Sequence, residues 1–405
     1  MVVKRCFLHS VLCAGVAAVA VATGAAPAGA QEIEELRRQI EALMQRVEQL
    51  EAQQRSGRAQ PAGAADALVE SGNDSIRLTL SGQVNRGVLF ADNGADSEVF
   101  HVDNDNSSTR VRMIGEGDLD DDITVGTQIE VQFESNSSAA ISFDQDSSAG
   151  PNNFTERKLE LYVDSDRAGR LWLGQGDTAS NSTSEVDLSG TAVVAHSAIG
   201  EMAGGLAFDL VRGGDSVRIK DAFSNFDGLS RDDRLRYDTP NLGGFTASAS
   251  AIETGTWDAA VRFSGDIAGT RAVAAVAYAD ANGFDQVNGS ASVLLPSGFN
   301  VTAAAGTRDL DAAGRDDPVF YYVKLGQRLD LFDIGGTALA VDFTQVEDLD
   351  ADGDEFTSYG VFFVQNIDPV ATELYLGVRN HELSVAGLAD PDDVFAVLAG
   401  ARIKF

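Results

Sequence analysis

The sequence predicts an all-β protein, a 16-stranded antiparallel transmembrane β-barrel that follows a short N-terminal coiled-coil helix. Three observations lead to this fold class. The chain begins with a secretory signal, its body is a long series of alternating strands, and it ends in an amphipathic strand that stops at Phe405. An exported chain without a long apolar helix can be integral to a membrane if its strands close, because closure satisfies the backbone hydrogen-bonding groups.

Residues 1–30 form the predicted signal peptide. Lys4 and Arg5 supply a basic start, an apolar run follows, and residues 28–30 (Ala-Gly-Ala) fit a small-residue cleavage site. A lipoprotein site at Cys13 is the weaker alternative, since a bulky residue precedes that cysteine. Both cysteines of the chain lie in this segment, so the mature protein is expected to have no disulfide, thiol catalysis or cysteine metal site.

The charge of the chain restricts its partners. The formal net charge is −32, and removal of the two basic residues of the signal leaves −34. Nucleic acid is not an expected partner, because its binding depends on clustered Lys and Arg. An acidic excess suits acidic external loops and a field that attracts cations.

Residues 31–55 carry the pattern of a coiled coil. Charged and amide residues separate apolar residues that recur at spacings of three and four: Ile33, Leu36, Ile40, Leu43, Val47 and Leu50. Isoleucine or valine at a with leucine at d favours a dimer, whereas Arg46 and Glu51 resemble the pairing residues of a short trimerisation motif. A single amphipathic helix is the other alternative. Residues 56–74, rich in Gly and Ala, are expected to be a flexible linker.

Residues 75–405 are expected to form the barrel. Apolar and polar residues alternate along each segment, which is the period of a strand with two different faces. The predicted strands span 76–90, 108–116, 122–135, 155–164, 169–176, 230–238, 244–252, 257–265, 270–279, 287–295, 298–307, 318–329, 335–346, 356–366, 370–380 and 393–405.

The connections between these strands fall into two classes of length. Short connections, such as 165–168 and 266–269, alternate with mostly longer and more acidic ones, such as 136–154 and 381–392. Short turns on the periplasmic side and long loops outside are the asymmetry expected of an outer-membrane barrel. In the last strand Ile403, Val397 and Phe395 share one face, and Phe405 would sit at the interfacial aromatic girdle.

Four stretches of the body resemble the sixteen-stranded general porins of Gram-negative bacteria. They are residues 80–90, residues 108–119, the terminal strand, and residues 230–245, which contain Arg234-Leu-Arg236-Tyr237 followed by Pro240 and Phe245. The resemblance implies a homotrimer in the cell outer membrane with a water-filled channel and one long loop folded into the lumen. It also implies that a barrel assembly machinery reads the last strand, with Phe405 as the assembly signal.

The longest connection, about residues 177–229, is the expected constriction loop. Its apolar runs would form an exposed patch unless they packed inside the barrel. Acids on this loop facing bases on the wall would set up a transverse field that orients dipolar solutes. Arg110 and Arg112 share a parity opposite to Val111 and Met113, so both should face the lumen. The candidate pore-constriction residues are Arg110, Arg112, Lys158, Asp177, Glu185, Asp187 and Glu201.

The predicted function is passive diffusion of small hydrophilic solutes and ions through an outer-membrane channel. The alternatives are a substrate-selective porin, a structural or adhesive protein tethered to the cell wall by its coiled coil, and a secreted soluble β-protein. Residues 348–353 begin like a calcium-binding EF-hand loop, but Tyr359 stands where the bidentate Glu is needed. We expect no enzyme, no cofactor and no metal site, because no nucleophile–base grouping or phosphate loop is visible.

Overall fold

The computed structural model describes residues 72–145, 154–211, 215–252, 255–310, 314–349 and 351–405. The predicted signal peptide and coiled coil, with Arg46 and Glu51, and most of the predicted linker lie outside these residues. No helix in the described ranges is long and apolar enough to cross a membrane.

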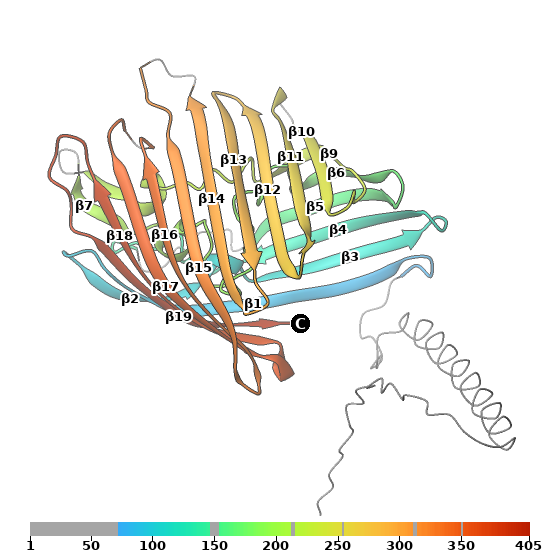
Figure 1. The fold of residues 1–405 in the computed structure, drawn as a ribbon, viewed down its shortest axis with the longest axis horizontal. Helices are drawn as coiled ribbons and strands as arrows, with labels where there is room; N and C mark the ends of the chain where they lie inside the picture. The colour runs from blue at the N-terminus through green and yellow to red at the C-terminus, as the bar shows by residue number, and fades with distance from the viewer. Residues whose placement is uncertain (1–71, 146–153, 212–214, 253–254, 311–313, 350) are drawn as a thin grey trace, which may run out of the picture. The chain divides into compact units, whose positions relative to one another are not determined.

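One large antiparallel sheet makes up most of the described chain (Figure 1). Its first strands are β1 (Arg77–Asp92), β2 (Ser97–Asp103), β3 (Arg110–Asp118), β4 (Ile123–Phe133), β5 (Phe154–Ser165), β6 (Gly169–Asp177) and β9 (Arg231–Asp238). They are followed by β10 (Phe245–Ile252), β11 (Trp257–Ile267), β12 (Thr270–Ala281), β13 (Phe284–Leu294), β14 (Phe299–Leu310), β15 (Val319–Phe332), β16 (Gly335–Glu347), β17 (Glu355–Ile367), β18 (Thr372–Ser384) and β19 (Val394–Lys404).

The sheet closes on itself, because β1 pairs with β19 as well as with the strands that follow it. β2 and β3 pair with successive parts of β1, on either side of the short 3-10 helix η1 (Asp105–Ser107). They therefore form one interrupted crossing, and the 17 strands of the sheet make a 16-stranded barrel. A second 3-10 helix, η3 (Asp368–Val370), turns the chain between β17 and β18. The predicted all-β barrel is confirmed.

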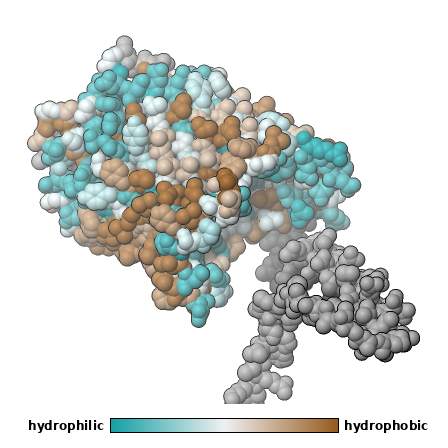
Figure 2. Space-filling model, viewed as in Figure 1, coloured by the Kyte–Doolittle hydropathy of each residue, from teal (hydrophilic) through white to brown (hydrophobic). Residues whose placement is uncertain are grey.

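Alternation along each strand sorts side chains between the outside and the lumen. On β5, Leu159 and Leu161 are exposed on the outer face, while Glu160 and Tyr162 are buried inside. Apolar side chains gather on the outer face that Figure 2 shows. This apolar outer surface is the one a membrane protein presents to lipid.

The terminal residue pairs with the first strand. Phe405 donates its backbone N–H to the Gly82 carbonyl at 3.0 Å and accepts from the Gly82 N–H at 2.8 Å. A Cβ at residue 82 would lie 2.6 Å from the Phe405 ring, so the glycine makes room for the aromatic side chain. The Phe405 side chain remains largely exposed at the edge of the barrel.

The sequence patterns missed five elements. Residues 91–107 were expected to be a loop, yet they contain β2, which extends the second crossing. The expected constriction loop contains a hairpin of β7 (Ala207–Val211) and β8 (Asp215–Arg218), and two single-turn helices, α2 (Gly200–Ala203) and α3 (Ile219–Ala222). Such short segments carry too few residues to show a periodicity of their own.

Candidate functional site: the barrel lumen

The segment between β6 and β9, residues 178–230, folds into the barrel and is called the lumen loop below. Its contacts reach β13 and the segment between β2 and β3, as shown by the hydrogen bonds from Val186 N–H to Ser290 Oγ at 3.1 Å and from Asn104 Nδ2 to the Val193 carbonyl at 2.8 Å. These contacts place the longest connection against the inner face of the barrel wall.

One side of the lumen loop is apolar. Buried loop residues pack against inward-facing residues of the wall, with ring centroids 6.0 Å apart for Phe223 and Phe320 and 6.3 Å apart for Phe208 and Phe356. The loop contributes Val193, Val194, Ile199, Met202, Leu206, Phe208, Ile219, Phe223 and Phe226 to this core. The wall contributes residues from β14 to β19, β1 and β2. This half of the lumen is therefore filled by a hydrophobic core.

A buried ion pair holds the loop on the same side. Lys324 of β15 is fully buried, and its Nζ lies 2.7 Å from Asp187 Oδ2 and 2.6 Å from the carbonyl oxygen of Ala195. Both Asp187 and Ala195 belong to the lumen loop. A buried charge pair is tolerated when each partner is fully engaged, so this contact fixes two points of the loop on the wall.

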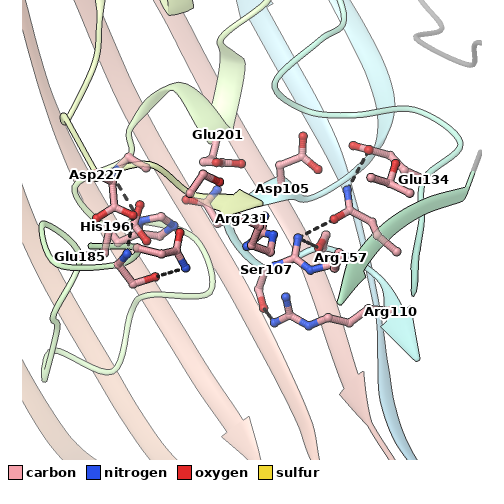
Figure 3. Close-up of a pocket in the computed structure, with 18 of the residues that line it drawn as sticks. Asp105, Ser107, Arg110, Glu134, Arg157, Glu185, His196, Glu201, Asp227 and Arg231 are labelled. Atoms are coloured by element: carbon pink, nitrogen blue, oxygen red, sulfur yellow. Dashed lines mark hydrogen bonds between the residues drawn. The ribbon is translucent and has the colours of Figure 1, made fainter. Parts of the chain in front are cut away.

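The other side of the loop faces a cavity of about 690 Å³. β3, β4, β5 and β9 form the opposite wall, together with η1. Six carboxylates and three guanidinium groups line the cavity (Figure 3): Asp105, Glu134, Glu156, Glu185, Glu201, Asp227, Arg110, Arg157 and Arg231.

Three of the six carboxylates of this cavity, Glu185, Glu201 and Asp227, belong to the lumen loop. Burial, together with repulsion from Glu185, raises the pKa of Glu201 to about 8 and that of Asp227 to about 7. Burial also raises the pKa of Glu185, whose carboxylate accepts a 3.1 Å hydrogen bond from Asn225 Nδ2. Burial and then the charge of Lys324 lower the pKa of the nearby His196 to about 4. The loop therefore groups three carboxylates that titrate above their ordinary range.

The basic face belongs to the wall, and a β-bulge shapes it. The register of β4 and β5 shifts at Glu130, so that Lys158 pairs with Glu130 and Glu156 with Val131. Arg157 is the extra residue, and the bulge turns its side chain inward, where its Nε lies 2.7 Å from Glu130 Oε1. Figure 3 shows Arg157 and Arg110 on the wall across from the loop acids.

Three of the seven candidate constriction residues line this cavity: Arg110, Glu185 and Glu201. Arg112 points into the lumen as its parity predicts, but it pairs with Glu130 at 2.5 Å and lines a smaller pocket beside Phe405. The other three lie outside the cavity lining, since Lys158 and Asp177 form an ion pair with each other and Asp187 is bound to Lys324.

Sequence reasoning did not select Arg157, Arg231 or Asp227. Strict alternation places Arg157 outside with Leu159, and only the bulge reverses it. Asp227 lies within the predicted loop but was not among the candidates. Arg231 belongs to the arginine-rich run at 230–245, so the quoted motif already contained the signal for it.

No group of three or more His, Cys, Asp or Glu in the described ranges is arranged to hold a metal ion. The acidic lining is thus a charged surface whose carboxylates spread over the loop, η1, the residue after β4, and β5.

A closed barrel with an apolar outer face and a charged, partly filled lumen defines a channel-forming protein of the outer membrane. The sequence profile of the family described as Gram-negative porin matches residues 16–385. The chain belongs to this family.

Solved structures share its fold. The anion-selective porin from Comamonas acidovorans is 17% identical, with 82% of this chain and 100% of that chain covered and a TM-score of 0.57. The outer membrane channel DcaP of Acinetobacter baumannii is 13% identical over 83% and 99%, with a TM-score of 0.54. OmpT of Vibrio cholerae, in trimer form, is 12% identical over 82% and 100%, with a TM-score of 0.51. None of the curated proteins matches the sequence.

The protein is therefore a porin of the outer membrane, a channel for passive diffusion of solutes. This agrees with the function and the location that the sequence predicts. At identities below 20%, the solved structures share the fold alone and do not decide which residues select solutes.

Proposed function

We propose that ions and small hydrophilic solutes cross the barrel through the 690 Å³ cavity, between the acids of the lumen loop and the arginines of β3, β5 and β9. The observation that carries the proposal is the filled apolar half of the lumen, which leaves the charged half as the path. Opposed acids and bases would set up a field across that path, which disfavours apolar solutes and orients dipolar ones.

The charge of the lining favours a weak preference for cations. Six carboxylates against three guanidinium groups give a formal excess of three negative charges, although the raised pKa values of Glu201 and Asp227 reduce it at neutral pH. A unit charge about 8 Å from a permeating ion in water contributes about 0.5 kcal/mol, or roughly a twofold change in the permeability ratio.

Reversal potentials of the purified protein in a planar bilayer, under a salt gradient, test this proposal. We expect Arg110→Gln to raise the cation-to-anion permeability ratio about twofold and Glu201→Gln to lower it by a similar factor at pH 9. Arg271→Gln is the control, because this exposed arginine lies at the β11–β12 turn beside Asp266. Unchanged reversal potentials in both lumen variants would place the constriction elsewhere. The differences should shrink in 1 M salt, where the screening length is about 3 Å.

The same recordings separate a general from a substrate-selective porin, the alternative left open by the sequence. In a general channel, added neutral solute causes no concentration-dependent block of the ionic conductance. A selective one shows concentration-dependent block by its solute, because a bound solute occupies the path.

We also propose that the protein is a homotrimer embedded in outer-membrane lipid. The trimer form of the Vibrio cholerae structure supports the oligomer, and the exposed apolar face supports the lipid contact. Chemical crosslinking followed by electrophoresis of unheated samples measures the oligomeric state. A species that remains at the mass of a single chain would contradict the homotrimer. The expected link to the cell wall through residues 31–55 is retained as a hypothesis.

Phe405 is proposed as the signal for the barrel assembly machinery. Deleting it removes one partly exposed aromatic ring, worth at most about 1.5–3 kcal/mol of burial, which is modest for a barrel of this size. We therefore expect the deletion to lower the level of the protein in the outer membrane far more than it lowers the heat stability of the protein refolded in detergent. Equal outer-membrane levels of the two forms would refute the role.

A further inference from the structure

Three arginines that do not line the 690 Å³ cavity converge on the neck of the lumen loop, where the chain leaves β6 and enters β9. Arg234 and Arg236 lie on β9, and Arg262 lies on β11. The first two belong to the Arg-Leu-Arg-Tyr run that carries the family resemblance. The channel path described above makes no use of them, so their role has to come from their contacts.

All three guanidinium groups donate to backbone carbonyls near the junction of β6 and the loop: Arg234 to carbonyls of β6, Arg236 to the last residue of β6 and the first of the loop, and Arg262 to the loop alone. Arg234 binds the carbonyls of Gly174 at 2.7 Å and Asp177 at 2.9 Å. Arg236 binds those of Asp177 at 3.2 Å and Thr178 at 2.9 Å. Arg262 binds those of Ala179 at 2.8 Å and Asn181 at 2.7 Å. Arg262 binds both of its carbonyls through the single nitrogen Nη2. A lysine side chain is shorter and would not carry its ammonium group to that position.

A carboxylate on the same strand as Arg262 adds further contacts to the neck. Asp258 of β11 is fully buried and accepts the N–H groups of Ala179 at 3.2 Å and Ser180 at 2.8 Å. Ser180 in turn accepts the Leu229 N–H at 3.0 Å, and the Thr178 N–H donates to the Ser230 carbonyl at 3.0 Å. The entry and the exit of the loop are therefore tied to each other as well as to the wall.

Of the three arginines, Arg262 is the best site for an experiment that distinguishes a positioning role from a role of its charge. In the described part of the chain it makes no ion pair, and its hydrogen bonds go to the two neck carbonyls alone. By contrast, Arg234 also binds Glu160 and Arg236 also binds Asp238. A change at Arg262 therefore alters the neck contacts without leaving a carboxylate unpaired.

We propose that Arg234, Arg236 and Arg262 form a neck clamp that positions the lumen loop, and thereby sets how far the loop acids stand from the wall arginines. In this role the three are positioning residues, which act on permeating ions through the loop and not by direct contact. The proposal rests on the constriction proposed above, because the loop matters to conduction only if the path runs beside it.

Single-channel recording of Arg262→Lys tests the clamp, because this variant keeps the charge while its shorter side chain withdraws the donor from the two neck carbonyls. We expect transitions between open-channel current levels to become about tenfold more frequent, as one charge-assisted hydrogen bond is lost. Arg262→Met should show the same change or a larger one. Arg271→Lys, at the exposed turn after β11, is the matched control and should behave as the unaltered protein does.

The outcomes distinguish the alternatives. If Arg262→Lys matches the unaltered protein in conductance, current noise and reversal potential, while Arg262→Met shifts the reversal potential alone, Arg262 is a lumen charge and the clamp is wrong. If Arg262→Lys does not assemble, the same recordings on Arg236→Lys decide by the same criteria. Failure of the constriction has a different signature, since Arg110→Gln and Glu201→Gln would then leave the reversal potential unchanged.

Discussion

The two sides of the lumen hold the same loop by different physical means. From β14 round to β2 the loop meets aromatic and aliphatic side chains, and a buried Lys324–Asp187 pair fixes it there. Toward β3, β4, β5 and β9 it presents Glu185, Glu201 and Asp227 across a cavity. Burial raises the pKa values of these acids, and repulsion from Glu185 adds to this for Glu201 and Asp227. The comparison shows that packing on one side allows mutually repelling charges to be held on the other.

The largest expected effect comes from breaking the buried pair on the apolar side. Lys324→Met leaves Asp187 buried without its cation, which costs about 3–5 kcal/mol. We expect a lower heat stability and a noisier channel, because the loop loses two anchoring points. Adding Asp187→Asn to the same chain should recover part of the stability, and thermal unfolding followed by circular dichroism measures both. A stable Lys324→Met with quiet conductance would show that the aromatic core alone holds the loop.

A smaller effect is expected from crowding the same interface. A methyl group at Gly377 of β18 would lie 2.8 Å from Val194 Cγ2 and 3.0 Å from the Phe362 ring, so the loop or the wall has to shift. Gly377→Ala should cost about 1–3 kcal/mol by overpacking. Adding Val194→Ala to the same chain should restore much of the lost stability, although each of the two changes destabilises the protein when it is made alone. Additive costs in the double variant, measured by thermal unfolding, would mean that the two residues do not touch.

The smallest expected effect concerns the charged side and depends on pH. Glu201 and Asp227 have pKa values raised to about 8 and about 7, so both are largely protonated at pH 6 and ionised at pH 9. The lining gains up to two negative charges over this interval, and the preference for cations should increase about two- to fourfold. Reversal potentials at pH 6, 7.5 and 9 measure it.

Glu201→Gln is the control for that pH dependence. This variant should lose the change in cation preference that Glu201 causes above pH 7, and it should keep the change that Asp227 causes. A selectivity that stays flat from pH 6 to pH 9 in the unaltered protein would mean that the loop acids titrate in their ordinary range. It would thereby remove the electrostatic difference between the two sides of the lumen.

The alternation of apolar and polar residues and the two classes of connection length were enough to predict the barrel. Both can be recognised along the sequence without knowledge of tertiary contacts. A strand that separates lipid from a polar lumen must repeat every two residues, and β5 does so from Leu159 to Val163. The filled half of the lumen left a weaker signal. Residues 319–323 (Val-Phe-Tyr-Tyr-Val) and 361–364 (Val-Phe-Phe-Val) are apolar at every position, as strands buried on both faces are.

The sequence by itself determined the 16-stranded barrel, the long loop, its acidic character, and the inward parity of Arg110 and Arg112. Tertiary structure alone decided which charges meet. The bulge at Glu130 turned Arg157 into the lumen, and the apolar packing of the loop drew Asp187 to Lys324 and away from the cavity. The physical reason is that parity is a property of one strand, whereas a constriction is set by the register of neighbouring strands and by the path of a loop between distant walls.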